Sequence, residues 1–186
     1  MSSIFASILA SGCKEGQPAY LNNKVALTNR MAVGLFAVAS IFVVVSLLYF
    51  PQLTYVPVVG QLICLSTLFL NRWGSVGFTR FLISIAPISL ATMYLAYGTT
   101  PGQPQPVGMT VFQFALIGIP FLLIDMREGI FLGLTVLINT LIFFAVGSLS
   151  SMLLLEHNIE LFHSPGLDFL FRCVGVGVLF WGFMSC

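Results

Sequence analysis

The polar groups best suited to coordinate a ligand lie close together in the stretch Glu156-His157-Asn158-Ile159-Glu160-Leu161-Phe162-His163. On a helix, Glu156 and Glu160 share a face at i and i+4, where two carboxylates can bridge a divalent cation or a basic ligand. His157 and His163 add imidazoles, whose unperturbed pKa of about 6.5 makes them candidate pH sensors. The same residue types are typical of any short solvated loop, so a ligand-binding loop and a plain loop both stay open.

Arg172 is the one charged residue inside an otherwise apolar stretch. An unpaired arginine deep in lipid costs roughly 2.5 to 3.5 kcal/mol. Asp168 precedes it by one helical turn, which predicts an ion pair on the same face, with the guanidinium reaching toward the membrane surface. The functional alternative turns Arg172 into the protein interior, where it would bind an anionic head group, a carboxylate ligand or Glu156.

Opposite charges also gather where apolar stretches end. Asp125, Arg127 and Glu128 can pair with Arg72 or Arg80, which flank a neighbouring turn. Surface ion pairs contribute only about 0 to 1 kcal/mol each, which suits a switch near balance. We therefore assign Arg72, Asp125, Arg127 and Glu128 to a signal relay, with purely topological charge as the alternative.

Soluble-type catalytic motifs are absent from the sequence. It contains no GxxxxGK[ST], HExxH or GxSxG motif, and the four cysteines and two histidines show no metal-ligand spacing. The only lysines, Lys14 and Lys24, precede the first long apolar stretch, which excludes a retinal Schiff base within a span. We expect no enzyme activity, no metal and no resident cofactor in this chain, although a lipid or a quinone has room to enter a bundle of this kind.

The elements that position these residues follow from an extreme composition. Of 186 residues, 58% are hydrophobic and only 7% charged, against roughly 25% charged in soluble domains. The apolar stretches are apolar all round, which favours helices over alternating barrel strands. A net charge of +1 argues against nucleic-acid binding. We predict an all-α membrane protein whose six transmembrane helices occupy residues 31–50, 53–70, 81–97, 107–124, 130–155 and 169–186, within one domain, 31–186.

The cations predict the orientation, because Lys and Arg near span ends stay in the cytoplasm. Six of the seven fall on one side: Lys14, Lys24, Arg30, Arg72, Arg80 and Arg127. Both termini are therefore expected on the cytoplasmic side of a bacterial inner membrane. Residues 1–30 would form a separate cytoplasmic segment, in which the helical spacing of apolar residues from Ile4 to Ala10 predicts a short interfacial helix.

Inside the spans, amides and prolines are the informative residues. Gln61, Gln113 and Asn139 are expected to tie helices together by hydrogen bonds, together with several hydroxyl side chains. Pro57, Pro87 and Pro120 each remove a backbone donor, and the resulting bends are expected to frame a cavity. Gly129 and Gly133 form a GxxxG pair that permits close helix approach, either within the bundle or across a dimer.

Three stretches at the predicted cytoplasmic edge carry a family resemblance. They are Leu27-Thr28-Asn29-Arg30, Leu70-Asn71-Arg72-Trp73-Gly74 and Pro120-Phe121-Leu122-Leu123-Ile124-Asp125-Met126-Arg127-Glu128. From about Lys24 onward, their order and spacing resemble the six-transmembrane N-terminal sensor modules that precede histidine kinase or adenylyl cyclase regions in Bacteroidetes-type receptors. The resemblance implies a receptor of two-component or cyclase signalling that detects a signal at or within the membrane and passes a helix displacement to a cytoplasmic output domain. Our leading hypothesis is therefore a sensory or anchoring domain that forms a homodimer and transmits through its sixth helix.

The sixth span departs from that family pattern, because it stops at Phe183-Met184-Ser185-Cys186 while still apolar. We therefore expect this sequence to be part of a longer chain. The rival hypothesis is an accessory subunit of a larger membrane complex, which would also be short, apolar and free of motifs. A small-solute transporter comes third, because ion relays generally need acidic residues at mid-membrane and every Asp and Glu here lies at an edge.

Overall fold

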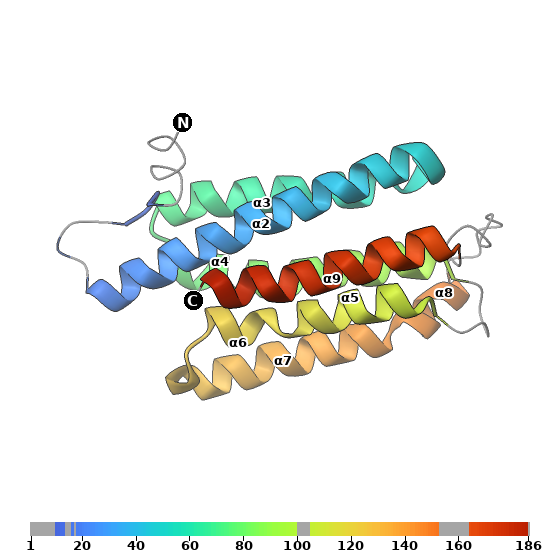
Figure 1. The fold of residues 1–186 in the computed structure, drawn as a ribbon. Coiled ribbons are helices and arrows are strands. Elements are labelled where there is room, and N and C mark those ends of the chain that lie inside the picture. The colour runs from blue at the N-terminus through green and yellow to red at the C-terminus, as the bar shows by residue number, and fades with distance from the viewer. Residues whose placement is uncertain (1–9, 14–15, 17, 100–104, 153–163, 186) are drawn as a thin grey trace.

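A computed structural model describes residues 10–13, 16, 18–99, 105–152 and 164–185, and within them the chain is helical with no strand. Its helices lie side by side in one bundle, and the start of α2 and the end of α9 are at the same end (Figure 1). The helices are α2 (Ala19–Tyr49), α3 (Tyr55–Arg72), α4 (Val76–Tyr97), α5 (Val107–Ile117), α6 (Ile119–Leu123), α7 (Gly129–Phe144), α8 (Val146–Met152) and α9 (Pro165–Ser185), with 3-10 turns η1 (Pro51–Leu53) and η2 (Met126–Glu128).

Five helical segments in the described residues are long and apolar enough to cross a membrane. They are Ala19–Tyr49, Pro51–Arg72, Val76–Tyr97, Met126–Phe144 and Pro165–Gly182. At about 1.5 Å per residue, eighteen residues already extend about 27 Å, close to the thickness of a hydrocarbon core. The prediction of an all-helical membrane bundle agrees with this result. The fourth predicted span corresponds to a shorter apolar segment, Val107–Leu123.

That fourth segment is broken into α5 and α6 at Gly118. The Gly118 N–H turns back to the Ala115 carbonyl, 3.2 Å away, which tightens the last turn of α5. Pro120 has no N–H to continue the α-helical pattern, so α6 begins with the proline in its first turn. The bend expected at Pro120 is therefore present, whereas Pro87 lies inside the continuous helix α4.

Two other helices differ in extent from the predicted spans. The predicted fifth span, 130–155, is not one continuous helix, because α7 ends at Phe144 and α8 follows Ala145; its last three residues lie outside the described part of the chain. The Ala145 N–H is shared between the Leu141 and Ile142 carbonyls, a pattern common at helix ends. The first helix begins at Ala19 and so extends before the predicted span, because polar residues at a membrane edge do not interrupt a helix.

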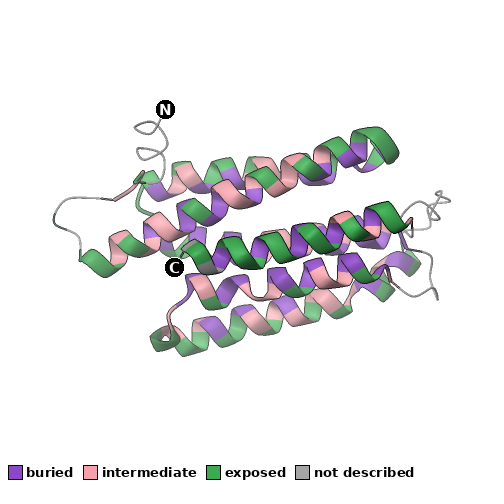
Figure 2. Cartoon of the chain, in the orientation of Figure 1, coloured by how far each residue is buried: buried purple, intermediate pink, exposed green. Residues whose placement is uncertain are grey.

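Helix α4 is the centre of the bundle and contacts α2, α3, α5, α6, α7 and α8. Half of its most apolar window is buried, against 17% for the α7 segment. The exposed residues of α7 and α9 lie on faces turned away from the bundle (Figure 2). In a membrane these apolar outer faces have lipid as their solvent, so their exposure carries no penalty.

Helices α5 and α9 pack most closely of all. A Cβ on Gly175 of α9 would stand 3.0 Å from Phe112 Cα and 3.1 Å from Phe112 N of α5. In the first turns of the two helices, the Asp168 carboxylate accepts a 2.6 Å hydrogen bond from the Gly108 N–H, one of the donors at the start of α5 that have no partner within the helix. The two helices are therefore joined by a close backbone contact and by a hydrogen bond from a backbone N–H to a side chain. These contacts favour movement of α5 and α9 as one unit.

Candidate functional site

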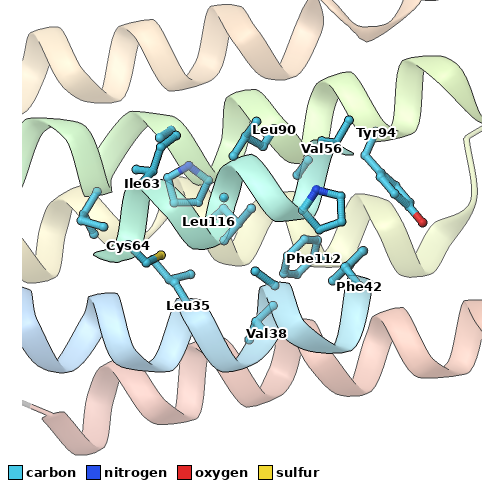
Figure 3. A pocket seen from close by; sticks show the side chains of 17 residues that line it. Leu35, Val38, Phe42, Val56, Ile63, Cys64, Leu90, Tyr94, Phe112 and Leu116 are labelled. Atoms are coloured by element: carbon cyan, nitrogen blue, oxygen red, sulfur yellow. The ribbon is translucent and has the colours of Figure 1, made fainter. Parts of the chain in front are cut away.

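An apolar cavity of about 70 Å³ lies among α2, α3, α4 and α5. Figure 3 shows the labelled side chains converging on it from these four helices. Its wall is hydrocarbon apart from the Cys64 thiol and the Tyr94 hydroxyl. The lining residues are Leu35, Val38, Ala39, Phe42, Val56, Pro57, Gly60, Ile63, Cys64, Ile83, Ala86, Pro87, Leu90, Ala91, Tyr94, Phe112 and Leu116.

Small residues and two prolines provide the space. Pro57 and Pro87 both line the cavity, as expected from the sequence, whereas Pro120 is not among the lining residues. Gly60 brings α3 close to α4, because a Cβ there would stand 3.3 Å from the Leu90 Cδ1. The helices therefore approach tightly at Gly60 and leave a gap beside it that side chains do not fill.

The polar tip of Tyr94 is already engaged. Its hydroxyl lies 2.9 Å from the Ser46 Oγ, in a buried hydrogen bond between α4 and α2. A hydroxyl bonded in this way has less to offer an occupant of the cavity. The wall therefore presents almost purely apolar groups, which selects an apolar occupant.

An aromatic cluster connects the cavity wall to α9. The Phe42 ring, in the wall, stacks on the Phe112 ring at 5.2 Å between centroids and on the Phe171 ring of α9 at 5.5 Å, with only 9° between the latter planes. Tyr94 meets Phe42 edge-on at 5.5 Å. Phe171 is 1% exposed, so it has no room to move independently of Phe42.

Ion pairs gather at one end of the bundle, which we call the charged end and define by Lys24, Arg80, Asp125 and Glu128. The Arg80 guanidinium of α4 lies 2.8 Å from the Glu128 carboxylate, and the Lys24 ammonium of α2 lies 3.5 Å from that of Asp125. Both pairs join the turn between α6 and α7 to another helix. The Arg80 side chain is 10% exposed, so its pair with Glu128 is the better shielded of the two.

The carboxyl of Asp125 has a pKa below its usual range. The main cause is a hydrogen bond that its carboxylate accepts from the Arg127 backbone N–H, 3.0 Å away, and the nearby Lys24 ammonium acts in the same direction. Both interactions favour the charged form. Asp125 therefore stays ionised and available to Lys24 throughout the neutral range.

The predicted relay residues are only partly brought together. Glu128 pairs with Arg80, as expected, but Asp125 pairs with Lys24, and within the described residues Arg72 makes no ion pair. Arg127 contributes its backbone N–H to the site. Lys24 is not among the predicted relay residues, because a separate segment is predicted for residues 1–30, whereas α2 starts at Ala19 and carries Lys24 beside the turn.

Of the predicted ligand-binding residues, Glu156, His157, Glu160 and His163 lie outside the described residues. The Arg172 guanidinium lies 2.6 Å from the Asp168 carboxylate, so the expected i, i+4 pair is present. Half of the Arg172 side chain is exposed, which places it on the outer surface of the bundle and not in its interior.

The interior amides tie helices together as predicted. Gln61 donates to Ser40 Oγ at 2.8 Å, Gln113 donates to Thr92 Oγ1 at 2.9 Å, and Asn139 donates to the Ser84 carbonyl at 2.9 Å. Gly129 and Gly133 have no heavy atom within 4 Å of a Cβ built on them. This pair therefore does not mediate close packing among the described helices, and its role across a dimer stays a prediction.

Sequence reasoning missed a buried polar cluster at the charged end. The Asn71 side-chain amide donates to the Asn29 Oδ1 at 2.7 Å, and the Thr79 hydroxyl donates to the Asn71 Oδ1. All three residues have 0% exposure. The sequence feature that indicates this cluster is the dipeptide Asn-Arg, which occurs twice, as Asn29-Arg30 and Asn71-Arg72. Both copies lie at the charged end of the bundle, in the neighbouring helices α2 and α3.

No protein-family model, curated protein or solved structure matches this chain. The resemblance to sensor modules of receptor kinases and cyclases therefore stays a prediction.

Proposed function

We propose that this chain is a membrane-embedded sensory bundle in which an apolar molecule in the cavity displaces α9, and that α9 relays the displacement to a cytoplasmic output region. The observation that carries the proposal is the ring contact from Phe42 in the cavity wall to Phe171 on α9. An occupant that moves Phe42 also moves its neighbour, because close-packed rings cannot interpenetrate.

The volume of the cavity limits the ligand. An engineered cavity that binds benzene has about 150 Å³, roughly twice the 70 Å³ present here. A quinone ring also needs hydrogen-bond donors for its oxygens, and the Tyr94 hydroxyl is already bonded to Ser46. The end of a hydrocarbon chain, from an acyl lipid or an isoprenoid, fits both the volume and the chemistry.

The driving force for such binding differs from that in water. Lipid tails are as apolar as this wall, so transfer from the bilayer brings no hydrophobic gain. What the chain end gains is dispersion contact with wall atoms that otherwise face a gap. A ligand shifts α9 only by the difference between its affinities for two arrangements of Phe42 and Phe171, which suits a sensor that works near balance.

The charged end is proposed to face the cytoplasm. It carries Lys24, Arg80 and Arg127, and Arg30 and Arg72 lie at the same end of the bundle, as the positive-inside rule requires. The end of α9 lies at this end too (Figure 1). The signal would then leave the membrane where the two ion pairs hold the turn between α6 and α7, and their modest strength permits rearrangement.

Photolabelling in nanodiscs tests the ligand site. The probes are a fatty acid and an isoprenoid alcohol, each with a diazirine at the end of the chain, and labelled peptides are mapped by mass spectrometry. We expect labels on lining residues of α3 and α4. Ala39→Leu, which fills the cavity, should abolish them, and Ala37→Leu, on the exposed face of the same helix, should not. Equal labelling of both variants would refute the site.

The relay is tested separately by the emission of Trp181 on α9, in a chain carrying Trp73→Phe so that Trp181 is the only indole. Addition of the chain probe that labels the cavity should shift this emission in the Ala37→Leu chain and not in the Ala39→Leu chain. Labelling without any emission change would leave the binding site intact and refute the relay.

A further inference from the structure

The N-terminal residues 10–13 dock onto the charged end of the bundle. They form a turn closed by a 3.0 Å hydrogen bond from the Cys13 N–H to the Ala10 carbonyl. Within this turn Gly12 has φ +91° and lies directly against the backbone of α3, so that a Cβ on Gly12 would overlap the Asn71 carbonyl group. Only glycine combines this backbone conformation with this approach.

The receptor for this turn is the buried cluster of Asn29, Asn71 and Thr79. The Thr79 hydroxyl donates to Asn71, the Asn71 amide donates to Asn29, and the Asn29 amide donates to the Ser11 carbonyl at 2.8 Å. Each of the three residues donates a hydrogen bond to the next, and the last bond is accepted by the backbone of the N-terminal turn. Hydrogen bonds in such a chain polarise one another, so the helices strengthen the bond that holds residue 11.

The recognition is specific for the backbone of the segment. The bundle contacts the carbonyl oxygen of Ser11 and the side of Gly12 where other residues carry a Cβ. No side chain of residue 11 or 12 takes part in these contacts. The Ser11 carbonyl accepts a hydrogen bond from the Asn29 amide inside this buried cluster, where polar groups are normally hydrogen-bonded. The site therefore fits a glycine-containing turn of the chain itself.

The same part of α2 also holds α9. The Trp181 indole N–H donates to the Arg30 carbonyl at 3.3 Å, and Trp181 lies over Gly34, where a Cβ would stand 2.5 Å from the indole nitrogen. Asn29, which binds the N-terminal turn, immediately precedes Arg30. We propose that residues 10–13 are a latch that docks on the Asn29–Asn71–Thr79 cluster and, while docked, holds α9 in place through Arg30. Docking does not depend on the cavity, and only the consequence for signalling rests on the proposed function.

The strength of the latch suits a switch. A single hydrogen bond plus one close backbone contact changes a docked-to-free ratio by about tenfold. Small changes at the cytoplasmic surface would therefore release the turn, whereas the bonds between Asn29, Asn71 and Thr79 would persist. The cluster thus supplies a fixed receptor and the N-terminal turn supplies the movable part.

Thiol labelling of Cys13 in nanodiscs tests docking, in a chain whose other cysteines are replaced by serine. Gly12→Ala forces a Cβ into the Asn71 carbonyl, and we expect Cys13 to react about tenfold faster with a hydrophilic maleimide. Gly16→Ala is the matched control, because Gly16 also has a positive φ, +87°, but a Cβ there meets nothing within 4 Å. Equal rates in the two variants would overturn the docking.

A second measurement needs no disruption of the turn. Cys13 in the otherwise unchanged turn is compared with Gly16→Cys in a chain lacking Cys13, and the docked Cys13 should react about tenfold more slowly; equal rates would again overturn the proposal.

The emission of Trp181, in a chain carrying Trp73→Phe, reports the coupling between the docked turn and α9. It should shift in Gly12→Ala and not in Gly16→Ala, and an unchanged emission despite faster Cys13 labelling would refute the hold on α9. None of these results depends on whether the cavity binds a ligand.

Discussion

Gly175→Ala is the sharpest test of how α9 is held. The added methyl would stand 3.0 Å from Phe112 Cα and 3.1 Å from Phe112 N, both backbone atoms that cannot rotate away. Optimal carbon contacts are 3.5 to 4.0 Å, so α9 and α5 must separate by a few tenths of an ångström. Phe112 also stacks on Phe42, so the displacement extends to the cavity wall.

The expected cost follows from two opposing terms. Overpacking of this kind costs about 1 to 3 kcal/mol, and replacing a helical glycine by alanine returns about 0.5 to 1 kcal/mol. The net loss in the free energy of unfolding is about 0 to 2.5 kcal/mol. For a chain of this length, at about 2 to 4 °C per kcal/mol, the Tm should be lower by up to about 10 °C.

Gly177→Ala is the matched control, because a Cβ on Gly177, two residues further along the same helix, has no heavy atom within 4 Å. This variant retains only the gain in helix propensity, so its Tm should rise by about 1 to 4 °C. The assay is thermal unfolding in one detergent, followed by tryptophan fluorescence. If Gly175→Ala were as stable as Gly177→Ala, the close contact between α5 and α9 would be refuted.

Two further predictions concern the charges. The pKa of Asp125 is lower in the folded protein than in the unfolded chain. Its ionised carboxylate therefore stabilises the folded state fully above the unfolded carboxyl pKa of about 4, and this stabilisation is lost as the pH falls through the pKa of the folded state. The Tm difference between wild type and Asp125→Asn should therefore be constant from pH 5 to 8 and shrink only in acid; a change centred near pH 6.5 would contradict it. Asp168→Ala removes the acceptor for the Gly108 N–H and should cost about 1 kcal/mol. Arg172→Gln removes only the half-exposed ion pair and should stay within about 0.5 kcal/mol of wild type in thermal unfolding. A loss as large as that of Asp168→Ala, which removes both interactions, would show that the ion pair and not the hydrogen bond to Gly108 holds this end.

Local features were the most predictable from the sequence. The Asp168–Arg172 pair follows from a four-residue spacing on one helix, and the bend at Pro120 follows from a missing N–H. The pairing of Glu128 with Arg80 was predicted as one of several combinations across neighbouring turns. Each of these depends on chemistry within a turn or two of chain, or on charges confined to one edge.

Contacts between distant residues were less predictable. The sequence stretches containing Asn29 and Asn71 were identified, but not their hydrogen bond to each other. Lys24 was assigned to a separate segment, although α2 carries it to Asp125. No proline near Phe144 indicates that the helix ends there, and the nearby residues are as apolar as those of an unbroken helix.

The sequence by itself determined the solvent of this protein and its all-helical class. Long, nearly uncharged stretches satisfy their backbone groups in lipid only as helices, and no tertiary information is needed for that conclusion. Only the tertiary structure decided which faces meet, where the 70 Å³ cavity lies and which polar residues form the Asn29–Asn71–Thr79 cluster. The physical reason is that these helices are apolar around their whole circumference. Their sequences do not distinguish a face buried in protein from a face turned to lipid, so the rotation of each helix is set by packing against its neighbours.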